Sequence, residues 1–566
     1  MNPVESTLPP LDFATLRDQI VGADATFETP FGNRLMVYCD YTASGRCLGF
    51  VERYLLELQR IYANTHTEDD VTGRSMTRLL HRAEQEIKRS VNAGPRGQLI
   101  ACGAGSTAAI DKLQQILGVA LPPATRDRVL RSMDERAQAH LQDTAPVVFI
   151  GPYEHHSNEI TWRQNLAQVV PIPLDAEGGI DLAVLESQLR DPRWQGRMKI
   201  GSFSAASNVT GMLSPVHALA ELLHRHDALA CFDYAACAPY VSIDMNPAGR
   251  PEAALDAVFI SPHKFLGGPG SSGVLVFNEA LYDSELGPTV AGGGTVDYVG
   301  TVSHDFVCNI EEREKAGTPG VLQTLKAALA FMIKDRLGTE SIEAREQELL
   351  SRAFSIWQAE PAIEILGNPD PARRVAIVSF NLRDPWGGYL HPKLVTVLLN
   401  DLFGIQSRAG CSCAGPYGHH LLGISDETSQ RYRRWVKAGY YGVKPGWCRI
   451  GFHFAMDDVE ADFIIQAVRF IAREGWRFLH VYHFDLKRAC WSHERESSCL
   501  DAFSLDAALA STGARCQSLA PALRADLYAR YLHEAENLAR ELESRGEPER
   551  NLETDPELQE LIFFRK

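Results

Sequence analysis

Between about residues 98 and 300, short apolar runs alternate with segments of helical pattern, and this alternation limits the possible folds more than any other feature. Such alternation is typical of βαβ units, in which helices cover a parallel sheet. The apolar runs are Gln98–Cys102, Val147–Ile150, Val169–Pro173, Lys199–Phe203, Ala228–Phe232, Ala257–Ile260 and Gly273–Phe277, and the first helices are expected over 106–119, 158–166, 181–190 and 214–226. We therefore predict an α/β fold with a parallel-dominated sheet.

The chain has 566 residues, which is too long for one hydrophobic core, so two or more domains are expected. The first residues include a short helical pattern, Leu35–Cys39 is expected as a strand, and a long helix is expected from about Thr318 to Asp335. After about residue 478 we expect a strand at Leu479–Phe484 and a charged amphipathic helix over 521–545, to which we assign no chemistry. The predicted division is an N-terminal segment (1–30), a large domain (31–317), a linking helix with a smaller α/β domain (318–478), and a C-terminal extension (479–566).

The overall charge narrows the classes of partner. A formal net charge of −16 argues against nucleic acid or an anionic membrane surface as the main partner. No apolar run approaches membrane-spanning length, and the N-terminus lacks the pattern of a signal peptide. Most of the 12 cysteines lie in apolar, strand-like surroundings that are typical of buried, reduced thiols. We therefore expect a cytoplasmic protein.

Lys264 lies between two apolar runs that are expected to be strands. A lysine there is costly unless its charge is used or removed. A Schiff base to an aldehyde removes the charge, and pyridoxal 5'-phosphate (PLP) supplies such an aldehyde. Asp233, at the end of the run Ala228–Phe232, is an acid that could keep the pyridine nitrogen protonated. The alternative is a buried ion pair and an unrelated surface lysine.

A glycine-rich turn opens the helix expected over 106–119. Free backbone N–H groups and the helix dipole at such a turn bind anions, and Ser106 and Thr107 add hydroxyl donors. By itself this signal is weak, because a glycine turn followed by a capping serine is common.

Taken in order, these motifs resemble class V of the fold type I PLP enzymes, which includes cysteine desulfurases and selenocysteine lyases. The resemblance extends from about residue 36 to about residue 475. It implies the fold type I architecture, with a mostly parallel seven-stranded sheet in the large domain and a smaller α/β C-terminal domain. It also implies a PLP cofactor and a homodimer with shared active sites.

The resemblance assigns roles around the cofactor. Ser261 and His263 would bind the phosphate together with the helix start, and Asn208 would bond the 3'-oxygen. His155, in the segment Glu-His-His-Ser-Asn, would stack on the ring and take part in proton transfer. Thr318 would reach the phosphate of the neighbouring subunit, and this match is the main reason to expect a homodimer.

On the substrate side, Arg449 matches the arginine that pairs with the α-carboxylate, and Arg408 matches a second substrate-side arginine. Ala43 and His66 match segments that line the entrance. Many desulfurases have a glutamine three residues after the acid, where this chain has Ala236. Either a histidine or water compensates, or the site is tuned to another substrate.

Cys413 lies five residues after Arg408, at the position where related desulfurases carry sulfur as a persulfide, and Cys411 is an additional cysteine. A cysteine nucleophile needs a lowered pKa or a nearby base. Three alternatives stay open: the cysteines only pack, they bind a metal with His419 or His420, or the loop is kept while the enzyme performs other Cβ chemistry. The spacing is poor for zinc, so we predict no metal site.

The predicted function is PLP-dependent conversion of L-cysteine or L-selenocysteine to L-alanine. Lys264, His155 and Cys413 are the candidate catalytic residues, and a protein that accepts the sulfur is a possible partner. The alternatives are another class V reaction, either transamination or an aspartate β-decarboxylation with aldolase-type Cβ chemistry, and a class V scaffold that serves as a binding protein.

Overall fold

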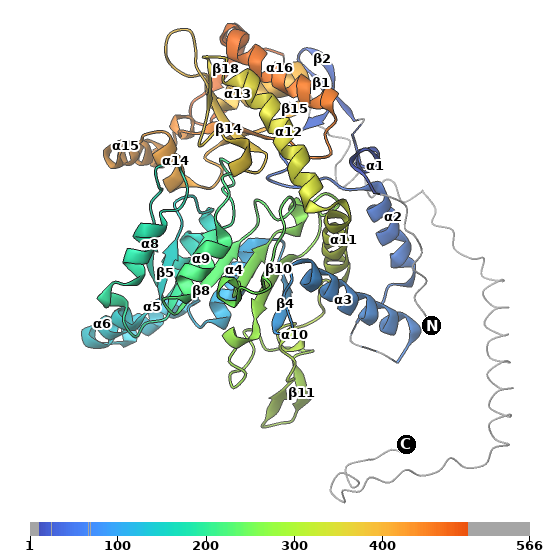
Figure 1. Cartoon of the computed structure of the whole chain (residues 1–566), viewed down its shortest axis with the longest axis vertical. Helices are drawn as coiled ribbons and strands as arrows, with labels where there is room; N and C mark the ends of the chain where they lie inside the picture. The colour runs from blue at the N-terminus through green and yellow to red at the C-terminus, as the bar shows by residue number, and fades with distance from the viewer. Residues whose placement is uncertain (1–10, 24, 66, 68, 496–566) are drawn as a thin grey trace, which may run out of the picture. The chain divides into compact units, whose positions relative to one another are not determined.

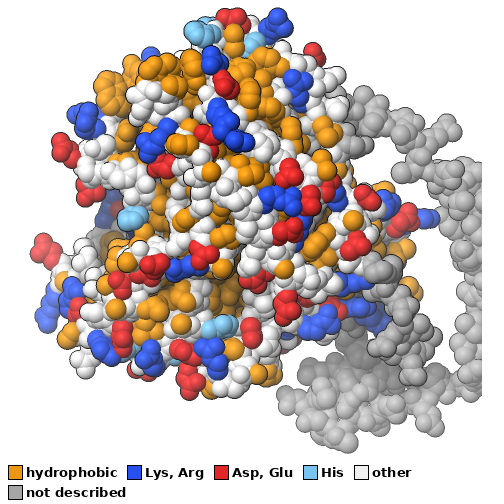
Figure 2. Space-filling model, turned by 45° about the horizontal axis from the view of Figure 1, so that its top comes forward, with side chains coloured by type: hydrophobic (Ala, Val, Ile, Leu, Met, Phe, Trp, Pro, Cys, Tyr) orange, Lys and Arg blue, Asp and Glu red, His pale blue; other side chains and the backbone are white. Residues whose placement is uncertain are grey.

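The computed structural model describes residues 11–23, 25–65, 67 and 69–495 (Figure 1). The helix predicted over 521–545 lies outside these residues. Among the helices of the described part, none combines the length and apolar character needed to cross a membrane. Side chains of both charges are interspersed over the face that Figure 2 shows.

A seven-stranded sheet forms the centre of the large domain and confirms the predicted fold class. Its order is β4 (Gly97–Cys102), β10 (Gly273–Asn278), β9 (Ala257–Ile260), β8 (Ala228–Asp233), β7 (Lys199–Ser204), β5 (Val147–Ile150) and β6 (Gln168–Pro171). β10 is antiparallel to both of its neighbours, and the other pairings are parallel. All residues of β5 and β9 are buried, as expected for strands covered on both faces.

Helices cover this sheet (Figure 1). α4 (Ser106–Ile116) packs on β9 and β10, α9 (Val216–His224) packs on β8, and α11 (Val321–Leu337) packs along α3 (Val71–Ser90). The other helices up to this point are α1 (Phe13–Asp18), α2 (Gly49–Leu58), α5 (Pro123–Ser132), α6 (Glu135–Thr144), α7 (Ile160–Gln164), α8 (Leu182–Leu189) and α10 (Ile310–Arg313). Short hairpins are formed by β1 (Thr26–Thr29) with β2 (Gly32–Leu35), and by β11 (Val296–Val299) with β12 (His304–Phe306).

A second, antiparallel sheet forms the smaller domain, in the order β13 (Ile363–Ile365), β14 (Ile377–Leu382), β17 (Trp447–Gly451) and β16 (Arg408–Gly410). Its helices are α12 (Thr339–Trp357), α13 (Pro392–Phe403), α14 (Gly415–Leu421), α15 (Asp426–Lys437) and α16 (Asp458–Glu474). The register sets Arg408 directly opposite Arg449. Like charges that face each other across strands are destabilising, so this pair needs an anion.

Two predicted strands differ from the observed ones. The segment Leu35–Cys39 is divided, because Leu35 ends β2 and the pair Val37–Tyr38 forms β3, which runs parallel to β15 (Ile405–Gln406). Leu479 belongs to a 3-10 helix, Gly475–His480, which continues the chain beyond α16. β18 (Tyr482–Asp485) therefore starts later than predicted and pairs with β19 (Cys490–His493). The Tyr482 hydroxyl donates to the Asp401 carboxylate over 2.5 Å, which attaches this hairpin to α13.

Candidate active site

The carboxyl ends of the parallel strands meet at one edge of the large sheet, where ligands of open α/β sheets bind. A cavity of about 290 Å³ lies there. Twelve of the fourteen predicted site residues line it: Ala43, Ser106, Thr107, His155, Asn208, Asp233, Ser261, His263, Lys264, Arg408, Cys413 and Arg449. The lining residues thus come from motifs spread between about residue 40 and about residue 450, and the fold brings them together in one pocket.

Lys264 and Asp233 form the polar centre of the pocket. Asp233 ends β8 and is buried, and one of its carboxylate oxygens accepts a hydrogen bond from the Ala235 N–H over 2.9 Å. Burial raises the pKa of Asp233, while the Ala235 N–H and Lys264 oppose the rise. Burial also lowers the pKa of Lys264 to about 8, with Asp233 acting in the opposite direction. A lysine with such a pKa can give up its proton near neutral pH, as a nucleophile or a base must.

The N-terminus of α4 forms one wall and offers donors to an anion. Ser106 N–H points to Ser261 Oγ over 2.8 Å, and Thr107 Oγ1 lies 2.7 Å from Ser157 Oγ. A Cβ atom added at Gly105 would lie 3.1 Å from Ser261 Oγ, so glycine keeps this wall open. Asp233 is the one carboxylate among the pocket-lining residues of the described chain. The donors and the open wall fit a phosphate group, and Lys264 with Asp233 fits a pyridine aldehyde.

Both histidines of the pocket are held in their neutral form. Burial lowers the pKa of His155 to about 4, and nearby Lys264 adds to this effect. The pKa of His263 is lowered to about 4 by the same two causes. His155 Nδ1 accepts the Ser157 N–H over 3.1 Å, which fixes the ring at the pocket edge. A neutral, oriented imidazole suits ring stacking and proton relay better than a permanent cation does.

Glu154, which precedes His155, is a supporting residue whose role the sequence did not reveal. Its carboxylate accepts hydrogen bonds from Ser204 N–H (2.9 Å), Ser204 Oγ (2.7 Å), Gly151 N–H (3.1 Å) and Asn158 Nδ2 (2.7 Å). Burial raises the pKa of Glu154 to about 7. The network connects the segment that carries His155 to the end of β7, which explains why the motif includes an acid and an asparagine.

Asp40 is the anion that the facing arginines require, and sequence reasoning missed it. Its Oδ2 accepts Arg408 Nε over 2.9 Å, and its Oδ1 accepts Arg449 Nη2 over 3.0 Å. Arg449 Nη1 also donates to the Asn208 carbonyl over 2.9 Å. The Arg449 side chain is 5% exposed, and burial lowers its pKa. Its Nε has no hydrogen-bond partner among the described residues, so a buried donor remains for a carboxylate ligand.

The loop 411–414 is a tight turn at the pocket mouth. Ala414 N–H donates to the Cys411 carbonyl over 3.0 Å, and Ser412 and Cys413 have φ angles of 50° and 57°. Positive φ at both central positions is the pattern of a type I′ turn, which normally prefers Asn and Gly. Both cysteines are exposed, which is contrary to the alternative that they only pack. His419 contacts Gly415 O and Ser429 Oγ through its two ring nitrogens, so the ring is engaged apart from the cysteines.

Two predicted residues are not brought to the pocket. Thr318 is exposed outside it, and its hydroxyl accepts a hydrogen bond from Asn64 Nδ2 over 3.2 Å. His66 lies outside the described residues. Ala236 does line the pocket, so this position presents a methyl group to the cavity.

Comparison with known proteins points to one family. The model of the family "Aminotransferase class-V" matches residues 129–463. A probable cysteine desulfurase of Halalkalibacterium halodurans is 28% identical over 386 residues, which are 67% of this chain and 84% of the relative. A probable cysteine desulfurase of Staphylococcus aureus is 29% identical over 393 residues, which are 68% of this chain and 84% of the relative.

Solved structures of cysteine desulfurases share the fold of this chain. An apo cysteine desulfurase from Thermococcus onnurineus NA1 superimposes with a TM-score of 0.62 at 20% identity, over 81% of this chain and 98% of that protein. A cysteine desulfurase from Escherichia coli superimposes with a TM-score of 0.60 at 21% identity, again over 81% and 98%. The fold is therefore shared over nearly the whole length of these proteins.

Proposed function

The chain belongs to the class-V aminotransferase family, and on this basis we propose that it is a PLP-dependent enzyme that converts L-cysteine to L-alanine and carries the sulfur on Cys413. The observation that supports this most strongly is the position of Cys413. It lines the same small cavity as Lys264 and Arg449, although Lys264 follows β9 of the large sheet and Cys413 lies about 150 residues further along the chain. The cysteine desulfurase relatives and the shared fold support the same reaction.

The residues that would hold the cofactor follow from the donor set. The start of α4, with Ser106 and Thr107, would bind the phosphate, Asp233 would pair with the ring nitrogen, and Lys264 would bind the aldehyde. When bound, PLP withdraws electrons from the substrate carbon atoms and so makes their protons easier to remove. Thr318 of a second subunit would complete the phosphate site, which makes the proposed enzyme a homodimer.

The substrate would be oriented by its carboxylate. Arg449 is buried and keeps Nε free for that group, while Asp40 and the Asn208 carbonyl hold its other two nitrogens. Lys264 lines the same cavity, so the amine of an amino acid held by Arg449 would lie toward Lys264. Lys264 Nζ, with its pKa lowered to about 8, would take the proton from the substrate Cα, and neutral His155 would relay protons at the same edge.

Cys413 would then attack the substrate sulfur as a thiolate. The bond between Cβ and sulfur breaks, a bond between Cys413 Sγ and that sulfur forms, and Cβ is protonated to give alanine. The thiol of L-cysteine becomes the outer sulfur of a persulfide, so atoms and electrons balance without an added oxidant. An acceptor protein would remove the sulfur. We place the reaction in the cytoplasm, which keeps thiols reduced.

Incubation of the purified full-length protein with PLP and L-cysteine tests the proposal. We expect a visible absorption band on uptake of PLP, and alanine in amounts equal to the sulfur released by an added thiol. Cys413→Ser should keep the absorption band and lose sulfide release, whereas Cys490→Ser, at an exposed cysteine of β19, should behave as wild type. If Cys413→Ser releases sulfide at the wild-type rate, the nucleophile is assigned wrongly. Formation of pyruvate, or formation of alanine when L-aspartate is the only substrate, would favour the other class V reactions.

A further inference from the structure

Cys411, the second cysteine of the turn at the pocket mouth, has no part in the reaction described so far. It is exposed, and it is not among the residues that line the pocket, whereas Cys413 is. One turn therefore carries two thiols, of which one faces the chemistry. We propose that Cys411 is a second sulfur-carrying residue, which receives the sulfur from Cys413 and presents it to the acceptor. This inference rests on the proposed function.

The turn holds the backbones of the two cysteines close together. The hydrogen bond from Ala414 N–H to the Cys411 carbonyl, 3.0 Å, closes the turn on its first and fourth residues. Consecutive Cα atoms are about 3.8 Å apart, and a closed turn brings alternate Cα atoms to roughly 5.5 Å. That separation is in the range that a bond between two cysteine sulfur atoms spans. Rotation of the two side chains would then let Cys411 attack a sulfur on Cys413 while the backbone of the turn stays in place.

The turn is also fastened to the pocket, which makes a transfer within the turn useful. Asn208 Nδ2 donates to the Ser412 carbonyl over 2.6 Å, and His156 N–H donates to the Cys413 carbonyl over 2.8 Å. Trp447 Nε1 donates to Ser412 Oγ over 3.2 Å. These contacts hold the backbone of residues 412 and 413 at the pocket, and two of them come from residues 156 and 208, far along the chain from the turn. Passing the sulfur to Cys411 leaves them intact.

The transfer balances as a thiol exchange. The Cys411 thiolate attacks the outer sulfur of the Cys413 persulfide, a bond forms between Cys411 Sγ and that sulfur, and the bond between that sulfur and Cys413 Sγ breaks. The electron pair of the broken bond returns to Cys413 Sγ, which leaves as a thiolate. No oxidant or reductant is needed, and Cys413 is ready for another substrate molecule.

The test follows the sulfur by mass spectrometry in the full-length, PLP-loaded enzyme. The enzyme is mixed with less than one equivalent of L-cysteine, quenched at intervals with an alkylating reagent and digested, and the added sulfur is located at residue 411 or 413 by fragmentation. In wild type we expect the added sulfur on Cys413 first. It should then increase on Cys411 while the amount on Cys413 falls. Cys411→Ser and Cys411→Ala should form alanine as wild type does in the first turnover, with the sulfur retained on Cys413.

Two control variants, and two measurements on the Cys411 variants, complete the test. Cys413→Ser should carry no sulfur on either residue, and Cys490→Ser should match wild type. The cofactor absorption band and the urea unfolding midpoint of the Cys411 variants show whether the turn still supports the fold.

Alanine formation with sulfur confined to Cys413 in wild type overturns this inference and leaves the proposed function standing. Label on Cys411 in Cys413→Ser overturns the order of transfer, and a Cys411–Cys413 disulfide with free sulfide shows attack at the inner sulfur instead. Absence of alanine from L-cysteine overturns the proposed function and this inference with it.

Discussion

One carboxylate lies between two arginines next to the candidate active-site pocket, and another does so beside a groove on α16. Asp40 bridges Arg408 and Arg449, two arginines that line the pocket. Near the groove, Glu360 contacts Arg473 over 2.5 Å and Arg469 over 3.6 Å. Arg449 is 5% exposed, whereas the two groove arginines are 37% and 51% exposed. The arginines of the two arrangements are therefore buried to different extents, and burial decides how much each ion pair changes the free energy of unfolding.

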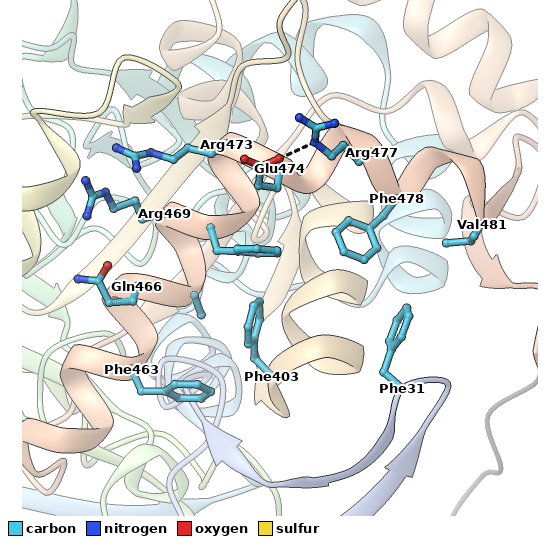
Figure 3. A pocket seen from close by; sticks show the side chains of 12 residues that line it. Phe31, Phe403, Phe463, Gln466, Arg469, Arg473, Glu474, Arg477, Phe478 and Val481 are labelled. Carbon is cyan, nitrogen blue, oxygen red and sulfur yellow. Dashed lines mark hydrogen bonds and ion pairs between the residues drawn. The ribbon is translucent and has the colours of Figure 1, made fainter.

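The two cavities also differ in volume, and the one with the buried arginine is the smaller. The groove is larger, about 970 Å³ against about 290 Å³ for the pocket, and Figure 3 shows its aromatic floor. Its aromatic residues are Phe31, Phe403, Phe463, Phe470 and Phe478. The pocket holds a lysine of lowered pKa, a buried acid and the proposed nucleophile, Cys413, within a third of that volume. The buried, hydrogen-bonded polar groups, rather than the volume of the cavity, are the reason to propose the smaller cavity as the active site.

Removal of Lys264 should have the largest effect. In the proposed mechanism Lys264 both binds the cofactor and moves the Cα proton, so in Lys264→Ala we expect alanine formation to fall on the order of 10³-fold or more. The absorption band of the bound cofactor should change as well. Lys444→Ala, at an exposed lysine stacked on Tyr441, is the control and should keep full activity. A Lys264→Ala enzyme with near-normal turnover would remove the basis for treating the pocket as the active site.

The pH dependence of stability should reveal a second buried lysine, Lys334 of α11. Lys334 donates to the Ala238 and Val241 carbonyls, and burial lowers its pKa from 10.5 to about 8. The unfolded chain therefore binds more protons between pH 8 and 10.5, so this residue makes the protein more stable as pH rises through that window. Compared with Lys334→Met, wild type should gain up to ~3 kcal/mol of unfolding free energy between pH 8 and 10.5. Urea unfolding at several pH values measures this gain, and parallel curves for the two proteins would contradict it.

Asp40→Asn tests the carboxylate that contacts the buried arginine, Arg449. The amide keeps the shape of the side chain but leaves the cross-strand arginines without their anion. We expect a loss of about 2 kcal/mol of unfolding free energy, less than for a fully buried pair because Arg408 is half exposed. Urea denaturation of the apoenzyme measures it. A loss below about 0.5 kcal/mol would show that water or another group already screens the arginines.

Glu360→Gln is the matched change at the groove and should have the smallest effect. Both of its arginine partners are well exposed, so water can replace the carboxylate, and we expect a loss below about 1 kcal/mol with unchanged kcat. The same urea titration and alanine assay apply. If Glu360→Gln costs as much as Asp40→Asn, burial does not separate the two arrangements.

Much of the site was predictable because its motifs follow strand ends. Asp233 ends β8, Lys264 follows β9 and His155 follows β5, and parallel strands bring their carboxyl ends to one edge. The order of apolar runs, together with the resemblance of the motifs to class V enzymes, therefore predicted that these side chains lie together. Strand boundaries were less predictable, because Met36 and Leu479 lie in apolar segments whose division depends on packing partners elsewhere.

Asp40 shows what could not be predicted. Its partners lie 368 and 409 residues further along the chain, and they become neighbours only through the pairing of β16 with β17. The tethering of Ser412 by Asn208 is of the same kind, because it joins the two domains across 204 residues. The role of Thr318 stays a prediction, since it concerns a second subunit.

The sequence by itself determined the fold class, the family and most of the pocket, because these depend on hydrophobic alternation and on short motifs whose residues act locally. Tertiary structure alone decided how the charges are compensated and how the two cysteines are presented. Burial, cross-strand register and a left-handed turn depend on contacts between distant segments. The free energy of a charge or a thiol is set by those contacts rather than by its neighbours in the chain.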